Sequence, residues 1–237
     1  MSTTSPTLWA VLPAAGVGRR MGGTIPKQYL ELAGRAVIDH TLELFVADQR
    51  IAGVAVALGV ADGYWDDTRY AGHPKVIRAT GGAERCHSVL NALAALDGLA
   101  ADSDWVLVHD AARPCLRTAD LDRLIDLLRE DAVGGLLGIP VRDTMKRSDC
   151  GERIGSKVER SILWHALNPQ MFRLGLLRHA LQEALAANDL VTDDASAVER
   201  LGYAPRLVEG HADNIKITRA EDLPLAHFYL RQQGRIT

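Results

Sequence analysis

The chain lacks the features of a secreted or membrane-spanning protein. Its three cysteines are widely spaced and form no CxxC motif, so the sequence predicts neither a disulfide framework nor a zinc knuckle. We therefore expect reduced thiols and a cytoplasmic location. The longest nearly apolar stretches, around 51–61 and 132–141, fall short of the roughly 18 residues of a spanning helix. The N-terminus has neither a basic nor an apolar segment, so we expect no secretory signal and no membrane partner.

The chain also lacks an excess of basic charge and any metal-ligand spacing. Its formal net charge of −3 provides no positive field for nucleic acid. The eight histidines form neither HExxH nor a similar pattern, so we name no metal-ligating residue. The 237 residues suit one α/β domain, and no repeat or long linker divides 1–237. The expected partner is a small anion that local cations bind.

The most informative stretch runs from Leu8 to Leu30. A short apolar segment ends at Pro13 and reads as a buried strand, and four glycines follow it. Such glycines let backbone N–H groups approach an anion. No carboxylate precedes Glu31 to neutralise the nearby cations, which are Arg19, Arg20 and Lys27. The spacing matches neither a P-loop nor a dinucleotide motif. The stretch predicts a phosphate-binding loop; the alternative is an ordinary strand-to-helix turn with solvated arginines.

Apolar strand-like segments alternate with helical periods along most of the chain. The expected strands are 8–12, 52–58, 75–80, 105–108 and 134–140, and the expected helices are 37–48, 84–96 and 121–130, the last capped at Thr118. This alternation predicts a Rossmann-like α/β fold, with a mostly parallel sheet flanked by helices on both faces. Ligands bind beyond the carboxyl ends of such strands. The site should therefore gather 13–18, 81–88, 110–113 and 142–144.

The last third of the chain combines a hairpin with further regular elements. Residues 141–164 alternate in polarity around a turn, which predicts a projecting β-hairpin arm. Helices 174–187 and 192–201 and strands 205–209 and 214–218 follow, and a final helix begins at Thr218, in capping-box spacing with Glu221. In the 214–218 strand, alternation turns Lys216 away from the apolar side, toward solvent or a ligand.

Several sequence blocks resemble one enzyme family. PAAGxGxRM followed by PK is similar to the signature of sugar-phosphate and polyol-phosphate nucleotidyltransferases. PKQYL at 26–30, VHDAARP at 108–114, PVRDTMKR at 140–147 and EGHADNIKIT at 209–218 resemble the 2-C-methyl-D-erythritol 4-phosphate cytidylyltransferase family, in that family's order. The resemblance implies that CTP and the polyol phosphate form 4-diphosphocytidyl-2-C-methyl-D-erythritol and pyrophosphate, in non-mevalonate isoprenoid precursor synthesis. It also implies Mg²⁺ or another divalent cation, held mainly by the CTP phosphates, and a homodimer through the 141–164 arm.

The resemblance assigns roles to individual residues. It gives the stabilisation of the reacting α-phosphate to Arg20 and Lys27. It gives the positioning of the polyol phosphate to Arg160 of the neighbouring subunit's arm, Lys216, Asp110, Arg113 and Thr144. It gives the binding of the nucleotide to Pro13, Ala14, Ala15, Gly16, Gly18, Met21, Gly82, Ala83 and Ser88. For each charged residue the alternative is an ordinary surface salt bridge.

Two positions depart from the family pattern. Ala83 replaces a frequent acidic residue, and Asn168 in LNPQMF replaces the more usual threonine. If the family uses an acidic side chain at position 83, the affinity for CTP should be lower here. Two other functions stay open: transfer to another polyol phosphate such as ribitol 5-phosphate, and a nucleotide-binding regulator without catalysis. Retention of both Arg20 and Lys27 argues against the regulator.

Overall fold

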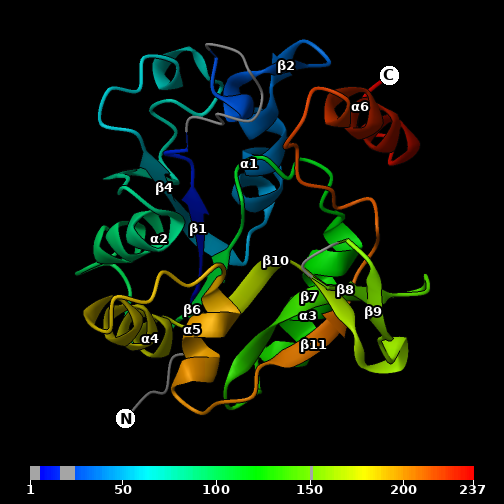
Figure 1. Ribbon diagram of the computed structural model, residues 1–237. Coiled ribbons are helices and arrows are strands. Elements are labelled where there is room, and N and C mark those ends of the chain that lie inside the picture. The colour runs from blue at the N-terminus through cyan, green and yellow to red at the C-terminus, as the bar shows by residue number, and fades with distance from the viewer. Residues whose placement is uncertain (1–5, 17–24, 150–151) are drawn as a thin grey trace.

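A computed structural model describes residues 6–16, 25–149 and 152–237. Its centre is a seven-stranded sheet in the order β11-β7-β10-β6-β1-β4-β5 (Figure 1). The strands on the N-terminal side are β1 (Leu8–Pro13), β4 (Ile51–Leu58), β5 (Val76–Thr80) and β6 (Trp105–Val108), and they run parallel. The remaining strands are β7 (Gly134–Pro140), β10 (Trp164–Arg173) and β11 (Arg206–Glu209). The mostly parallel sheet confirms the predicted fold class.

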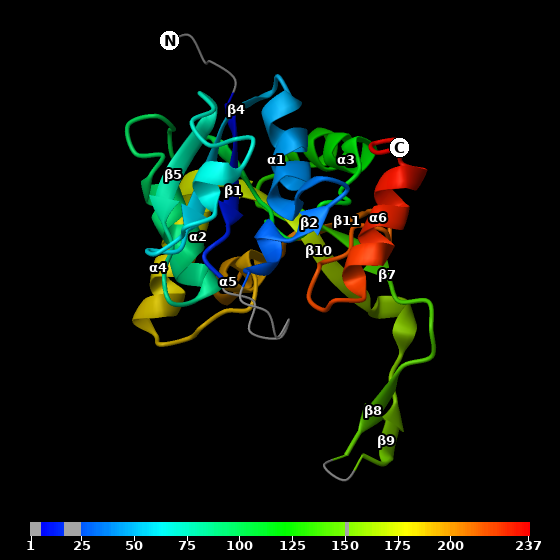
Figure 2. The ribbon, with the colours of Figure 1, turned by 90° about the horizontal axis from the view of Figure 1, so that it is seen from above.

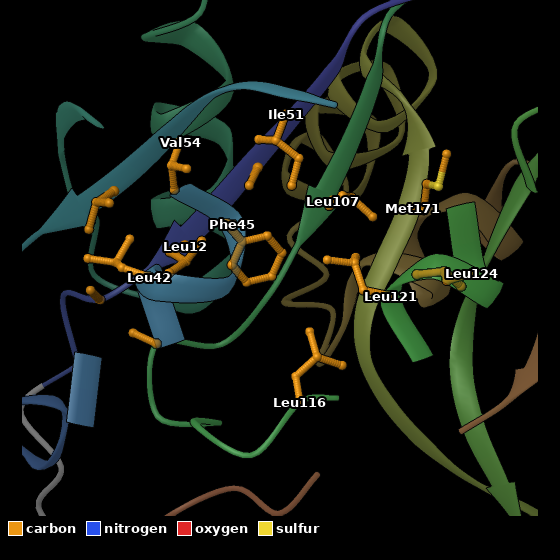
Figure 3. Packing of buried hydrophobic residues seen from close by; sticks show 14 of the residues in the cluster. Leu12, Leu42, Phe45, Ile51, Val54, Leu107, Leu116, Leu121, Leu124 and Met171 are labelled. Carbon is orange, nitrogen blue, oxygen red and sulfur yellow. The ribbon is translucent and has the colours of Figure 1, made fainter. Parts of the chain in front are cut away.

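Helices cover both faces of the sheet. Successive side chains of β1 point to opposite faces, and both sets are apolar, so each face needs a covering layer. Ala10 and Leu12 of β1 face α1 (Val37–Ala47) and α3 (Thr118–Leu128). Trp9 and Val11 face α2 (Arg85–Ala94), α4 (Leu174–Ala186) and α5 (Asp194–Arg200). Figure 3 shows the first of these layers, where Leu42 and Phe45 of α1 pack near Leu12. Each face of the sheet is therefore covered by a buried apolar layer.

Smaller elements complete the fold. A two-stranded ribbon joins β2 (Glu31–Leu32) and β3 (Arg35–Ala36), and α6 (Asp222–Gln232) packs near it through a small cluster that includes Leu32, Ala226 and Leu230. In the part of the chain that the structure describes, short 3-10 turns occur at η2 (Lys27–Tyr29), η3 (Trp65–Asp67) and η4 (Arg160–Ile162). None of the described helices is long and apolar enough to cross a membrane.

The predicted arm is present as a hairpin of β8 (Lys146–Ser148) and β9 (Ile154–Lys157), which pair antiparallel. It extends away from the body of the molecule (Figure 2). Every residue of these two strands is exposed, including Ile154 at 70%. An isolated two-stranded hairpin is marginally stable in water, so this arm is suited to packing against another surface.

Four sequence expectations were wrong in detail. β10 was not expected, yet it lies between β6 and β7 and is antiparallel to both. Residues 214–218 form no strand; their alternation arises because Ile217 packs against the cluster beneath α6. Thr118 is the first residue of α3 rather than its cap. At α6, Asp222 rather than Glu221 accepts the hydrogen bond from the Thr218 amide, at 2.7 Å.

Candidate functional site

A pocket of about 260 Å³ opens at the carboxyl ends of β1, β5 and β6. Three of the four expected strand-end segments, 13–18, 81–88 and 110–113, contribute described residues to it, as the rule for parallel sheets predicts. Its described lining residues are Pro13, Ala14, Ala15, Gly16, Lys27, Gln28, Gly82, Ala83, Glu84, Arg85, Ser88, Asp110, Ala111, Ala112 and Lys216. A second hollow of about 430 Å³ shares Ala15, Gly16, Gln28, Gly82 and Ala83 with it. Together they offer room for an elongated ligand.

Two glycines let the loop after β5 pass close to its neighbours. A Cβ atom at Gly81 would lie 2.1 Å from the Cβ of Ala15, and one at Gly82 would lie 2.2 Å from the Cβ of His87. Neither distance is possible for real side chains, so both positions require glycine. The close approach brings the end of β1 and the start of α2 to one wall of the pocket.

Hydrogen bonds fix the backbone of this wall. The amide of Ala14 donates to the carbonyl of Ala57 at 2.8 Å, and Gln28 donates to the carbonyl of Ala14 at 2.6 Å. The amide of Gly82 donates to the Ser88 hydroxyl at 3.0 Å, and that hydroxyl donates to the carbonyl of Glu84 at 3.2 Å. The predicted residues Ala14, Gly82 and Ser88 are therefore held in place by the protein itself.

The opposite side of the pocket is a charged cluster around Asp110. Its Oδ2 lies 2.7 Å from Lys216 Nζ and 3.6 Å from Arg113 Nε, and its Oδ1 lies 3.1 Å from Arg85 Nε. Burial acts to raise the pKa of Asp110, but Arg85, Lys216 and Arg113 outweigh it and lower this pKa below its ordinary value. Asp110 is therefore an ionised hydrogen-bond acceptor at neutral pH.

Two buried groups support this cluster from behind. Asp194 is fully buried and lies 2.7 Å from Arg85 Nη2. His109 is fully buried, and its Nε2 lies 3.0 Å from the carbonyl of Arg113. Burial lowers the pKa of His109 to about 4, so its ring is neutral and its Nε2–H donates to that carbonyl at neutral pH. His109 thus holds the backbone of the loop that carries Arg113.

Arg113 contacts Asp110 but is not among the residues that line the pocket. Its Nε donates to the side chain of Asn168 at 3.0 Å and its Nη1 to the carbonyl of Asn214 at 2.7 Å. Asn168 lies in β10, so the position that departs from the family pattern orients the Arg113 guanidinium. This connection links β10 to the loop that carries Lys216.

Thr144 and Arg160 lie elsewhere, in the arm segment, and neither lines this pocket. Both are exposed, and Arg160 donates to the carbonyl of Arg142 in the same chain at 2.6 Å. The segment 142–144 after β7 therefore does not join the other strand-end segments within one chain. Gly18, Arg20 and Met21 lie outside the described residues.

Sequence reasoning missed Gln28, Arg85 and Asp194. Gln28 stands within the PKQYL block, and Arg85 lies within the expected 81–88 segment, but neither was singled out. Asp194 gave no distinguishing signal, because a carboxylate at the start of a helix usually caps it. Only the fold brings Asp194 to Arg85, across 109 residues of sequence.

The described residues offer no ready-made metal cage. Within 6–16, 25–149 and 152–237, no group of three or more His, Cys, Asp and Glu side chains could hold an ion. Both oxygens of Asp110 already contact cationic side chains. The pocket instead combines small residues with two lysines, one arginine and the carboxylates of Glu84 and Asp110, an arrangement suited to a polyanion with hydroxyl groups.

Comparison with known proteins gives one consistent answer. The family model of 2-C-methyl-D-erythritol 4-phosphate cytidylyltransferase matches residues 8–232. A protein of that name from Pseudomonas putida is 55% identical over 234 residues, which is 98% of each chain. One from Pseudomonas aeruginosa is 56% identical over 219 residues, 92% of this chain and 94% of that one. A crystal structure of the Francisella tularensis enzyme superimposes with a TM-score of 0.82 at 34% identity, over 94% of this chain and 100% of that one.

A match of this length and identity, together with the shared fold, assigns both family and reaction class. The chain belongs to the 2-C-methyl-D-erythritol 4-phosphate cytidylyltransferase family and is a CTP-dependent nucleotidyltransferase of isoprenoid precursor synthesis.

Proposed function

We propose that the pocket beyond β1, β5 and β6 is where this chain transfers the cytidylyl group of CTP to 2-C-methyl-D-erythritol 4-phosphate. The observation that carries the proposal is the convergence of Pro13–Gly16, Lys27, Gly82–Arg85, Ser88, Asp110 and Lys216 on one pocket. In this reaction a phosphate oxygen of the acceptor attacks the α-phosphorus of CTP, a new P–O bond forms, and the bond to pyrophosphate breaks. The products are 4-diphosphocytidyl-2-C-methyl-D-erythritol and pyrophosphate.

The reaction requires no general base. The second pKa of a phosphate monoester is about 6, so the attacking group is already mostly a dianion at neutral pH. The barrier is instead the approach of two anions and the charge that builds up on the α-phosphate. Positioned cations are what the protein must supply.

The nucleotide occupies the glycine-rich side of the pocket. Lys27 and Arg20 stabilise the charge on the α-phosphate, and Gly16, Gly18 and Met21 surround the triphosphate. The small residues of the opposite segments leave space for a pyrimidine; they are Pro13, Ala14, Ala15, Gly82, Ala83 and Ser88. Because the amides of Ala14 and Gly82 already donate within the protein, other backbone atoms of these segments read the edge of the base.

The acceptor occupies the charged side of the pocket. Lys216 binds its phosphate, and Asp110 accepts hydrogen bonds from its hydroxyls through the remaining lone pairs of its carboxylate. Arg113 holds this wall through Asn168 and Asn214. Arg160 and Thr144 complete the site from the arm of the neighbouring subunit in a homodimer. Their absence from the pocket of their own chain supports this arrangement.

Mg²⁺ or another divalent cation would neutralise part of the triphosphate charge when bound. It would be held mainly by the triphosphate oxygens of CTP, because Asp110 is engaged by Arg85 and Lys216. Cytoplasmic thiols stay reduced, which suits the buried free thiols of Cys86 and Cys115. We therefore assign the enzyme to the cytoplasm.

The decisive experiment measures pyrophosphate release from CTP, Mg²⁺ and 2-C-methyl-D-erythritol 4-phosphate. We expect release by the wild type and a loss of about 100-fold in Lys27→Ala, the scale of one removed transition-state contact. Arg129→Ala is a control, because Arg129 and its partner Glu130 are both exposed. If the wild type releases pyrophosphate only with ribitol 5-phosphate, then ribitol 5-phosphate is the acceptor. If the wild type releases no pyrophosphate with any of the acceptors, the proposal is contradicted.

A further inference from the structure

Arg85 joins two carboxylates that come from distant parts of the chain. It is the first residue of α2, Asp194 is the first residue of α5, and Asp110 follows β6. Its Nε lies 3.1 Å from Asp110 Oδ1 and its Nη2 lies 2.7 Å from Asp194 Oδ2. The side chains are 23%, 10% and 0% exposed, in the order Arg85, Asp110 and Asp194. Ion pairs this far from water act strongly on their neighbours.

The position of Arg85 is not explained by the helix that carries it. A cation in the first turn of a helix is disfavoured by the helix dipole. Burial raises the pKa of Asp194, and the neighbouring Arg85 opposes that rise. Asp194 Oδ1 has no hydrogen-bond partner in the part of the chain that the structure describes. The buried carboxylate of Asp194, which contacts Arg85 through Oδ2, therefore anchors the guanidinium of Arg85.

Different cationic side chains contact the two oxygens of Asp110. Arg85 contacts Oδ1, and Lys216 contacts Oδ2 at 2.7 Å. The planar guanidinium can contact two carboxylates at fixed angles, which a lysine ammonium cannot reproduce. The orientation of Asp110 consequently depends on Arg85, and the position of Lys216 Nζ depends on Asp110.

We propose that Arg85 is a positioning residue for the transfer reaction: anchored on Asp194, it holds Asp110 in the orientation that presents Lys216 to the phosphorylated acceptor. This inference rests on the proposed function of the pocket. It assigns Asp194 a supporting role. It also predicts that loss of Arg85 raises the KM for the acceptor more than the KM for CTP.

The first test is the kinetics of Arg85→Gln. We expect the KM for the acceptor to rise and kcat to fall, each by about 10-fold, because misplaced substrate-binding groups lose rate as well as affinity. The KM for CTP should stay within about threefold. Arg178→Gln is the matched control, since Arg178 pairs with the exposed Asp97 on the surface, away from the pocket. It should leave all three constants unchanged.

A pH profile separates positioning from simple stabilisation. The charged groups that face Asp110 are Arg85 from α2, Arg113 from its own loop and Lys216 from the loop before α6. Without Arg85 the pKa of Asp110 rises, so NMR titration of the Asp110 carboxyl should show a higher midpoint in Arg85→Gln than in the wild type. The acid limb of kcat/KM is set by the acceptor phosphate and should not move. A variant that merely unfolds more would lower kcat and leave the acceptor KM and the Asp110 titration midpoint in place.

Arg85→Gln leaves the charge of Asp194 buried and unpaired, which can destabilise the fold. A double variant, Arg85→Gln with Asp194→Asn, removes that charge, so its kinetics can be measured on folded protein. The double variant should regain thermal stability while its acceptor KM stays raised. An acceptor KM within about twofold of the wild type, with an unmoved Asp110 titration midpoint, would overturn the inference and leave the proposed function standing. Absence of product from the wild type would overturn the proposed function, and the inference with it.

Discussion

At the scale of single residues, the pocket depends on groups whose protonation the fold has altered. His109 illustrates this: its ring is fully buried, stacks at a tilt against Phe45 and leaves Nδ1 without a partner among the described residues. Protonation at Nδ1 would place a charge in this apolar environment. The neutral ring is therefore part of the support for the Asp110–Arg113 loop.

We predict that His109 makes stability depend on pH. Its folded pKa of about 4 lies below the ordinary value of about 6.5, so the unfolded chain binds the extra proton more readily between these values. The free energy of unfolding should fall by about 3 kcal/mol as the pH falls through this window, and level off below it. NMR titration of the His109 ring is the measurement. A midpoint near pH 6.5 would contradict the prediction.

At the scale of elements, the loop before α6 carries Lys216, and one carboxylate ties the end of this loop to the helix. Asp222 Oδ2 accepts hydrogen bonds from the Thr218 amide at 2.7 Å, the Thr218 hydroxyl at 3.0 Å and the Arg219 amide at 2.8 Å. These bonds tie the loop to the first turn of α6. Glu221, which the sequence favoured, instead faces Arg219 in an exposed pair.

Asp222→Ala should lower the free energy of unfolding by about 1–3 kcal/mol, because it leaves donors of the loop unsatisfied. It should also raise the KM for the acceptor, since Lys216 lies two residues before Thr218. Glu221→Ala is the control and should change stability by less than about 0.5 kcal/mol. Chemical denaturation together with steady-state kinetics provides both readings. Equal effects of the two substitutions would show that the Asp222 bonds do not secure the loop.

At the scale of the whole molecule, the arm lies apart from the pocket of its own chain. The arm projects from the body, and its strand residues are exposed (Figure 2). Ile162, at its base, is 77% exposed. Apolar groups this exposed suit an interface, and a two-fold dimer is the commonest arrangement that would bury them.

Mixing two inactive variants tests whether Arg160 acts across subunits. In a mixed dimer of Lys27→Ala and Arg160→Ala, the site that keeps Lys27 would receive an intact Arg160 from its partner. Subunits exchanged in equal amounts should recover about a quarter of the wild-type activity, because half of the dimers are mixed and each has one complete site. If Arg160 serves its own chain, the mixture stays inactive. Sedimentation of the wild type as a monomer would also reject the dimer.

The sequence alone determined the features that depend on local pattern. Strand and helix alternation predicted the mostly parallel sheet, because hydrophobic period reports secondary structure directly. The glycine-rich stretch and the strand-end rule together predicted most of the described pocket lining, including Lys27, Asp110 and the 82–88 segment. Gly81 and Gly82 fall within the expected 81–88 segment, and the structure added the reason why both are glycine, which is the close approach of Ala15 and His87.

Only the tertiary structure decided the features that depend on distant contacts. β10 escaped the sequence pattern because its first half is partly exposed and its register is irregular between Ala166 and Gln170. The alternation at 214–218 resembled a strand because Ile217 packs beneath α6, which no local period can distinguish from pairing. Arg85 and Asp194 meet across 109 residues, and their charges acquire a role only where the fold removes them from water.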